Sequence, residues 1–245
     1  MAGEVSAVGG EADTIGIAEA RSALAWWLDA GVDTLIQDDP RDWLKPAPPK
    51  IPLKPAEAPP QNLVQPAHET LAELRDWLSS SMQLPLASAT ARRLLPHGPE
   101  NAAVMLLSDA HTFEDSAAGQ PIGGEAWELT KRMLAAIKIP ADEAYSASLS
   151  CLHVPGSKMS AADREACAEI ALKHIRLAKP KRLLLLGDGP AQALLGKPLP
   201  QARGHVHKIE GVRTVATFHP RALINQPSNK SLAWKDLLLL MEDEA

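Results

Sequence analysis

Residues 211–237 read GVRTVATFHPRALINQPSNKSLAWKDL and contain a strand-like segment, a turn and a helix-like segment in succession. The first eight residues carry four β-branched side chains, which predicts a strand over 211–218. His219 and Pro220 follow at once, and the proline ends the strand because it has no N–H to donate. A polar segment leads into SLAWKDLLLLME (231–242), which is typical of a helix. A strand followed by a helix is the repeating unit of α/β proteins.

The same alternation runs through the preceding part of the chain. Three more segments predict strands: AAVMLLS (102–108), AYSASLS (144–150) and KRLLLLG (181–187). Apolar residues at helical spacing predict helices over 68–80, 123–137, 160–178 and 188–196. Strands that alternate with helices form parallel sheets with helices on both faces. We therefore expect an α/β fold, a three-layer α/β/α sandwich around a central four-stranded parallel sheet.

The N-terminal part has a different composition. TIGIAEARSALAWWLDAG (14–31) is typical of a helix, whereas the segment from Pro46 to Pro66 contains 8 of the 21 prolines. A run so rich in proline cannot sustain the hydrogen bonds of a helix or a sheet. We predict a helical extension over residues 1–45, a proline-rich linker over 46–67 and the main domain over 68–245.

Charge and composition exclude several classes of protein. The 245-residue chain has a net charge of −5, and all of this excess lies in residues 1–67, which hold 10 acidic and 5 basic residues. The main domain is neutral, so it does not resemble a strongly basic nucleic-acid binder, although a local basic face is compatible with it. No apolar run reaches the roughly 18 residues of a membrane span, and no secretory signal is recognisable. We expect a cytoplasmic protein without a disulfide framework, since it has two cysteines.

The loops that follow the predicted strands are the place to look for a site, because parallel sheets bind ligands at the carboxyl ends of their strands. These loops read SDAHTFEDSAAGQPIGG (108–124), CLHVPGSKM (151–159), GDGP (187–190) and HPRALINQP (219–227). Histidines gather in or near them. His205 and His207 alternate along the chain, which fits half of a metal site or, more simply, a solvated edge strand. The GDGP turn lacks the spacing of a phosphate-binding loop and is assigned a structural role.

Four of these segments, taken in order, resemble the uracil-DNA glycosylase superfamily and especially its family 4. The segment VATFHPRALINQPSNKSLAWKDL (215–237) resembles the family's His-Pro turn and closing helix. Upstream, AVMLLSDA with GQPIGG resembles its first strand, catalytic loop and Gly-x-Pro turn. PKRLLLLGDGPAQALLG and QARGHVHKIEG resemble its third strand with the next helix, and its Arg-Gly loop. The resemblance covers residues from about 70 to 245.

The resemblance implies a DNA substrate, single- or double-stranded, whose nucleotide is flipped out so that its base can be removed. His219 would donate a hydrogen bond to the leaving base, and Asp109 would orient the attacking water. Leu223 or Ile224 would be the wedge that fills the vacated space, with ordinary packing as an equal alternative. Three basic residues would contact phosphates: Arg203, Arg221 and Lys230. Five positions would contact the base: Ala110, His111, Phe113, Ile122 and Ser148.

The catalytic loop and base pocket depart from the family pattern. Family 4 opens its catalytic loop with Gly-Glu-Ala-Pro-Gly, where this chain has Ser-Asp-Ala-His-Thr. Ile122 occupies the position of the family's base-stacking phenylalanine, and Phe113 is the aromatic that would compensate from another angle. Ala147 or Ser148 falls where an asparagine reads the uracil edge, so the choice of base does not carry over.

The cysteines also depart from the family. Family 4 holds an iron–sulfur cluster on four cysteines, and Cys151 and Cys167 match one pair, with no cysteine at the other positions. Two thiolates do not complete such a site, and His153 is a poor substitute. We predict that the cluster is lost and that the chain carries no cofactor.

Two functions follow from this comparison. The favoured one is a degenerate superfamily member that binds DNA with weak or no base excision, and whose acidic extension and linker recruit a protein partner. The alternative is an active DNA glycosylase for uracil or hypoxanthine. A small-molecule enzyme on a flavodoxin-like sheet is a weaker third, because no phosphate loop fits.

Overall fold

The computed structural model describes residues 21–22, 26, 68–88, 91–109, 112–153 and 159–242. The chain divides into two units, Met1–Pro60 and Gln61–Ala245, and the fold below is that of the second. The predicted linker and almost all of the predicted N-terminal helix lie outside the described residues. None of the helices in the described part of the chain has the length and apolar character needed to cross a membrane.

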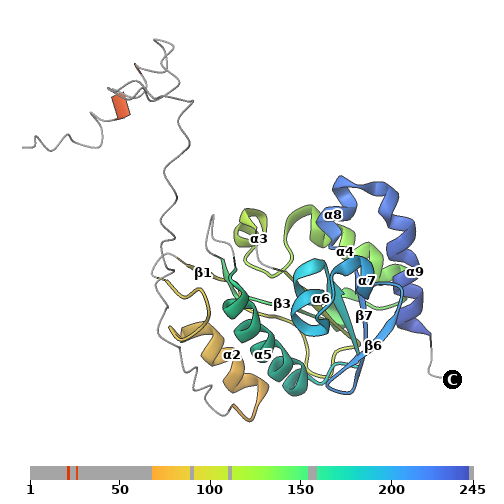
Figure 1. The fold of residues 1–245 in the computed structure, drawn as a ribbon, viewed down its shortest axis with the longest axis horizontal. Coiled ribbons are helices and arrows are strands. Elements are labelled where there is room, and N and C mark those ends of the chain that lie inside the picture. Colours follow the sequence, from red (N-terminus) through yellow and green to blue (C-terminus); the bar gives the residue numbers. More distant parts are fainter. Residues whose placement is uncertain are drawn as a thin grey trace, which may run out of the picture. The chain divides into compact units, whose positions relative to one another are not determined.

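The core of the domain is a five-stranded sheet in the order β3-β2-β5-β7-β6 (Figure 1). Four strands are parallel: β2 (Val104–Ser108), β3 (Ala144–Ser148), β5 (Arg182–Leu186) and β7 (Val212–Thr217). They confirm the four predicted strands. A fifth strand, β6 (Val206–Ile209), pairs antiparallel with β7 at the edge, which places His207 on an edge strand. A separate two-stranded ladder joins β1 (Arg92–Arg93) to β4 (Leu152–His153).

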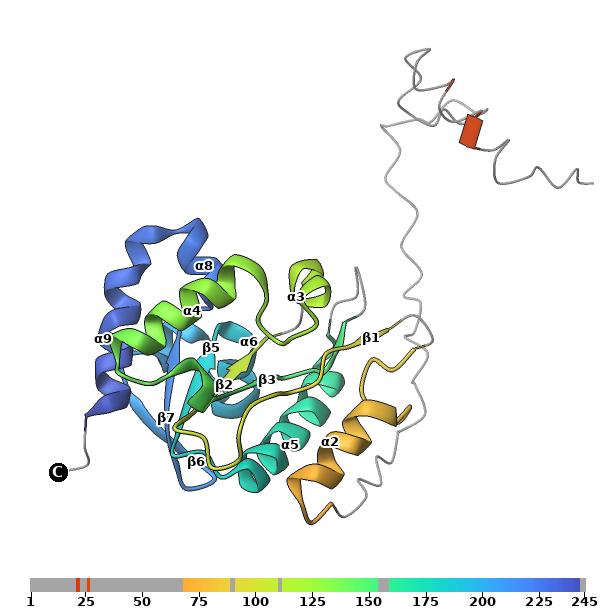
Figure 2. The ribbon, with the colours of Figure 1, turned by 180° about the vertical axis from the view of Figure 1, so that it is seen from behind.

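Helices cover both faces of the sheet and complete the three-layer sandwich. One face packs against α5 (Ala161–Ala178), α6 (Asp188–Leu195) and α7 (Leu199–Ala202), as Figure 1 shows. The other face packs against α4 (Gly124–Ala136) and α9 (Lys230–Met241), which Figure 2 shows from behind. Met105 and Leu107 of β2 face the first layer, and Val104 and Leu106 face the second, since successive side chains of a strand alternate.

A further helix, α2 (Leu71–Ser80), packs against α5. Its start carries a capping box, in which the Thr70 hydroxyl accepts from the N–H of Glu73 and the Glu73 carboxylate accepts from the N–H of Thr70. A small apolar cluster joins α2 to α5 and to the segment after β3: Leu74, Leu78, Leu84, Cys151, Leu152 and Ile170. The helix therefore adds a third apolar cluster to the two that cover the faces of the sheet.

Two short helices occupy segments that were expected to be loops. α3 (Phe113–Ala118) begins at Thr112, whose hydroxyl accepts from the N–H of Asp115 in a second capping box. α8 (Pro220–Asn225) begins at His219, with proline at its first position, where no N–H is needed. Both helices lie at the carboxyl edge of the sheet, directly after β2 and β7.

Candidate active site

The order of the strands brings three loops together. β5 lies between β2 and β7, so the turn after β5 lies between the loop after β2 and the loop after β7. Asp109 follows β2 directly, Gly187 follows β5, and His219 stands one residue beyond Phe218 after β7. The carboxyl ends of parallel neighbours share one edge. Two residues that are far apart in sequence, Asp109 and His219, therefore flank the same glycine turn.

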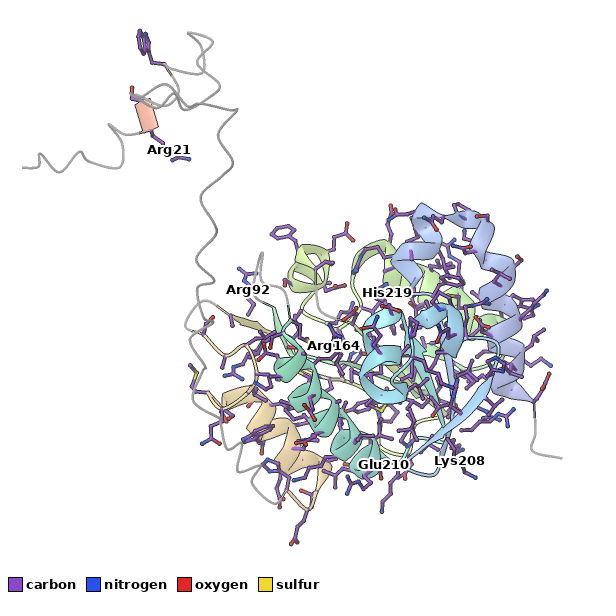
Figure 3. All side chains as sticks on the ribbon, in the orientation of Figure 1. Arg21, Arg92, Arg164, Lys208, Glu210 and His219 are labelled. Atoms are coloured by element: carbon purple, nitrogen blue, oxygen red, sulfur yellow. The ribbon has the colours of Figure 1, made fainter. Side chains whose placement is uncertain are left out.

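A cleft of about 830 Å³ opens at this edge. Asp109, His219 and Arg221 line it, together with Arg164 of α5 and Gln192 of α6. The two residues predicted to be catalytic thus line one cavity. Figure 3 labels His219 and Arg164 at this end of the domain.

The turn Gly187–Asp188–Gly189 is in contact with both predicted catalytic residues. A Cβ added to Gly189 would fall on the carboxylate of Asp109, so glycine is required for the observed position of that side chain. Gly187 has φ 98°, which favours glycine, and a Cβ placed there would lie 3.5 Å from the Cβ of His219. The sequence predicts a purely structural role for this turn. Its two glycines also leave room for the side chains of the site.

His219 is held as a neutral imidazole. Its Nδ1 accepts a hydrogen bond from the backbone N–H of Arg221 at 3.2 Å, so the proton of the neutral ring is on Nε2. Burial, helped by the nearby positive charge of Arg221 and opposed by Asp115, lowers the pKa of His219 to about 4. The side chain therefore has an N–H donor and no charge at neutral pH.

Asp115 is a functional residue that the sequence did not single out. Its side chain is 2% exposed, and its Oδ1 accepts from the N–H of Gly123 at 2.7 Å. Its Oδ2 accepts from the N–H and the hydroxyl of Thr112 and from the Nη2 of Arg221, all within 2.9 Å. Burial raises the pKa of Asp115, but these hydrogen bonds and the Arg221 charge outweigh it, and the pKa lies below its ordinary value. The carboxylate links the loop after β2 to the turn after β7.

This part of the chain matches known proteins. The sequence model of the uracil-DNA glycosylase superfamily matches residues 95–239, which include the sheet and all three loops. The chain belongs to this superfamily. It is similar to the type-4 uracil-DNA glycosylase of Pyrobaculum aerophilum, with 23% identity over 180 residues that cover 69% of this chain and 92% of the relative. The type-4 uracil-DNA glycosylase of Archaeoglobus fulgidus is 22% identical over 141 residues, 53% of this chain and 71% of that protein.

None of the three described residues that were predicted to contact the base, Ile122, Phe113 and Ser148, is among the residues that line the cleft. Ile122 is 1% exposed and packs in the core beside Leu106 and Ala126, so in this conformation its side chain cannot pack against a base. A contact between Ile122 and a base stays a prediction, and it would require this side chain to leave the core. Phe113 is 78% exposed at the start of α3 and does not belong to the residues that line the cleft.

Ser148 and the two remaining predicted base contacts differ in what the structure says of them. Ser148 is half-buried at the end of β3, and its hydroxyl donates to the carbonyl of Ser150 at 2.8 Å. That bond turns Ser148 toward its own loop. Ala110 and His111 lie outside the described residues.

The predicted phosphate contacts are similarly divided. Arg221 lines the cleft while pairing with Asp115, whereas exposed Lys230 lines a separate groove with Trp234 between α4 and α9. Arg203 makes a two-nitrogen ion pair with buried Asp236, at 3.0 to 3.2 Å, and stacks over the ring of Phe218. Its side chain is 18% exposed, so Arg203 serves to hold the strand end beside His219.

Leu223 is not an exposed wedge. Leu223 is 1% exposed on α8, which fits the packing alternative that the sequence left open beside the wedge role. Ile224, the other residue proposed for that role, is half-buried. Insertion by Leu223 would require α8 to rearrange.

The residues around the two cysteines do not fit a four-thiolate cluster. Cys151 and Cys167 line one small cavity of about 20 Å³ whose lining is otherwise mostly apolar, and His174 is its one further nitrogen or sulfur side chain. Burial raises the pKa of the Cys151 thiol to about 11 and that of Cys167 to about 12. The sequence has no third cysteine, and no cluster of three or more metal-ligating side chains occurs among the described residues. His153 lies on β4, and its side chain is outside the described part.

Proposed function

We propose that this protein is a DNA glycosylase that hydrolyses the N-glycosidic bond of a deaminated base extruded from DNA. The observation that carries the proposal is that Asp109 and neutral His219 line one cleft and flank the same glycine turn. The superfamily membership and the type-4 relatives support the reaction class.

The two side chains suit the two halves of the reaction. When the bond between the sugar C1′ and the base nitrogen breaks, its electron pair moves onto the base and gathers at a carbonyl oxygen. The Nε2–H of His219 donates a hydrogen bond to that oxygen as negative charge develops on it. Because the neutral imidazole keeps its proton, His219 does not have to regain one after the reaction. The Asp109 carboxylate stabilises the positive sugar and orients the water whose oxygen bonds to C1′, and the proton that this water loses neutralises the departing base anion.

The substrate class follows from the same donor. Uracil and hypoxanthine both present a carbonyl oxygen that gains charge as the base leaves, so either can accept from His219. Ser148 supplies no side-chain amide and Ile122 no aromatic ring, and neither residue lines the cleft. A site without those contacts discriminates weakly between such bases.

A second candidate is a degenerate protein that binds DNA without excising a base. The burial of Ile122 and the turning of Ser148 toward its own loop favour it, because both remove contacts that hold a flipped base. The role of residues 1–67 in recruiting a protein partner, and the cytoplasmic location, are further proposals.

A glycosylase assay separates the two candidates. Labelled DNA with a central uracil, hypoxanthine or xanthine, single- and double-stranded, is incubated with the protein, and abasic sites are cleaved by alkali. We expect strand cleavage that the His219→Ala and Asp109→Asn substitutions reduce by about 10²-fold or more. His205→Ala, at an exposed histidine outside the cleft lining, is the matched control. Absence of cleavage on all substrates, with DNA binding retained, would favour the degenerate protein.

A further inference from the structure

Arg164 is a charged residue of the cleft to which neither the sequence nor the proposed chemistry gives a role. It lies near the start of α5, and its side chain lines the same cleft as Asp109 and His219. Figure 3 shows it toward the end of the domain that carries His219, far from Glu210 at the opposite end. A cation at this place faces whatever the cleft holds.

The guanidinium of Arg164 is held in position by a chain of hydrogen bonds. Its Nη1 donates to Oε1 of Gln192 at 3.1 Å, and Nε2 of Gln192 donates to the carboxylate of Asp188. The other oxygen of Asp188 accepts from the N–H of Leu199 at 2.7 Å. Gln192 therefore orients Arg164, and both oxygens of Asp188 already accept hydrogen bonds within α6 and at the start of α7.

The charge of Arg164 is not neutralised by a direct ion pair with any described residue, because its hydrogen-bond partner is a neutral amide. Arg221, the other arginine of the cleft, is paired with the carboxylate of Asp115 at 2.9 Å. Arg164 thus keeps both a net charge and unused N–H donors toward the cavity. A planar guanidinium with free donors is suited to the oxygens of a phosphate.

The position of the reaction limits what Arg164 can meet. A nucleotide whose glycosidic bond lies between Asp109 and His219 brings its own phosphates into the same cleft, since each phosphate is a few covalent bonds from that sugar. Phosphate contacts of this kind fix the register of a bound strand and do not depend on the base.

We propose that Arg164 binds a backbone phosphate of the extruded nucleotide, with Gln192 as the residue that positions its guanidinium. The inference rests on the proposed function only in taking DNA as the ligand of this cleft. It requires binding and not turnover, so it is tested separately from catalysis.

The test is the salt dependence of DNA binding, measured by fluorescence anisotropy with labelled single-stranded oligonucleotides that contain uracil, hypoxanthine or no damaged base. We expect Arg164→Ala to weaken binding about tenfold for all three. The slope of log K against log salt should become shallower by about 0.7, the value for one lost phosphate contact on a single strand. Arg164→Lys should retain most of the slope, and Gln192→Ala should weaken binding with the slope largely preserved.

The matched control is Arg176→Ala, since Arg176 lies on the same helix at the opposite end and pairs with Glu210 at 3.0 Å. It should leave both affinity and slope unchanged. A loss in Arg164→Ala confined to one base would show that Arg164 reads the base, and an unchanged slope would also overturn the proposal. A protein that binds as expected but excises nothing would overturn the proposed function alone. A wild-type protein without salt-dependent DNA binding would overturn both.

Discussion

Nη2 of Arg221 lies 2.9 Å from Oδ2 of Asp115, an ion pair between two residues 106 positions apart in the sequence. Arg221 also donates its backbone N–H to the ring of His219, while Asp115 accepts from the backbone of Thr112 and Gly123. The pair therefore fastens the loop that follows Asp109 to the turn that carries His219. The relative position of the two proposed catalytic groups depends on it.

Replacing Asp115 by asparagine should separate these loops. Both oxygens of Asp115 accept hydrogen bonds, whereas an asparagine would point its NH₂ at one set of donors and would leave Arg221 without its counter-charge. We expect Asp115→Asn to lower the free energy of unfolding by about 2 kcal/mol and to reduce glycosylase activity. Urea denaturation followed by circular dichroism measures the first effect.

The control for this prediction is Glu128→Gln, which breaks the exposed i,i+3 pair of Glu128 with Lys131 on α4. An exposed pair of this kind contributes little to stability, so the free energy of unfolding should change by less than about 0.5 kcal/mol. If Asp115→Asn were no more destabilising than Glu128→Gln, the ion pair would not hold the loops.

Acidification should destabilise the folded domain. The pKa values of His219 and His174 are lowered by burial to about 4 and about 3 from an ordinary 6.5. Between pH 6.5 and the lowered pKa values, the unfolded chain binds protons at these histidines and the folded chain does not. The free energy of unfolding therefore decreases as the pH drops from 6.5 toward 4. Urea midpoints measured at about pH 7 and about pH 5 should show the decrease.

The variant that tests the contribution of His219 is His219→Asn. Asparagine does not titrate in this range, yet its side-chain oxygen can still cap α8 by accepting from the backbone. We expect the variant to lose less stability on acidification than the wild type. An equal loss in both proteins would mean that the pKa of His219 is not lowered by folding.

Substituting Gly189 by alanine should displace Asp109. The added methyl group would occupy the space of the Asp109 carboxylate, and a displacement of about 1 Å in a catalytic group can reduce the rate about 10²-fold. We expect Gly189→Ala to lower kcat while the thermal unfolding transition persists. In an Asp109→Ala background the same substitution should reduce activity no further, because the clash is gone. An additive loss in the double variant would indicate a different role for Gly189.

The sheet could be predicted from the sequence because its signals are local. Runs such as 102–108 and 181–187 are apolar throughout, as strands covered on both faces must be, and His219 stands out because it ends a strand. The antiparallel edge strand was anticipated only as the simpler explanation of His205 and His207. Its pairing follows from the short turn before β7, where Glu210 and Gly211 have positive φ.

The contacts within the site are harder to predict from the sequence because they join distant segments. Nothing near Asp115 in the sequence reveals Arg221, although the Thr112-x-x-Asp115 spacing is a readable capping box that predicts α3. The burial of Ile122 and Leu223 depends on how α4 and α8 pack, and an aliphatic residue in a loop gives no sign of the direction in which it points. Gln192 could have been found only from its contact with Arg164.

Finally, the protein should fold without an iron–sulfur cluster. The cavity beside Cys151 and Cys167 is lined mostly by apolar side chains, some of them from α2 and the segment after it, and Arg93 fixes the end of α2 by donating to the carbonyl of Leu78 at 2.8 Å. We expect protein purified without oxygen to lack the brown absorbance of a cluster and to contain no stoichiometric iron.

The double variant Cys151→Ala with Cys167→Ala should remain folded and keep its DNA affinity, because protonated, buried thiols act as small apolar groups. Leu84→Ala should be the more damaging change, by about 2 kcal/mol or more in urea denaturation, since it removes a larger buried side chain from the same cluster. Iron at one cluster per chain, lost in the cysteine variant, would contradict this account.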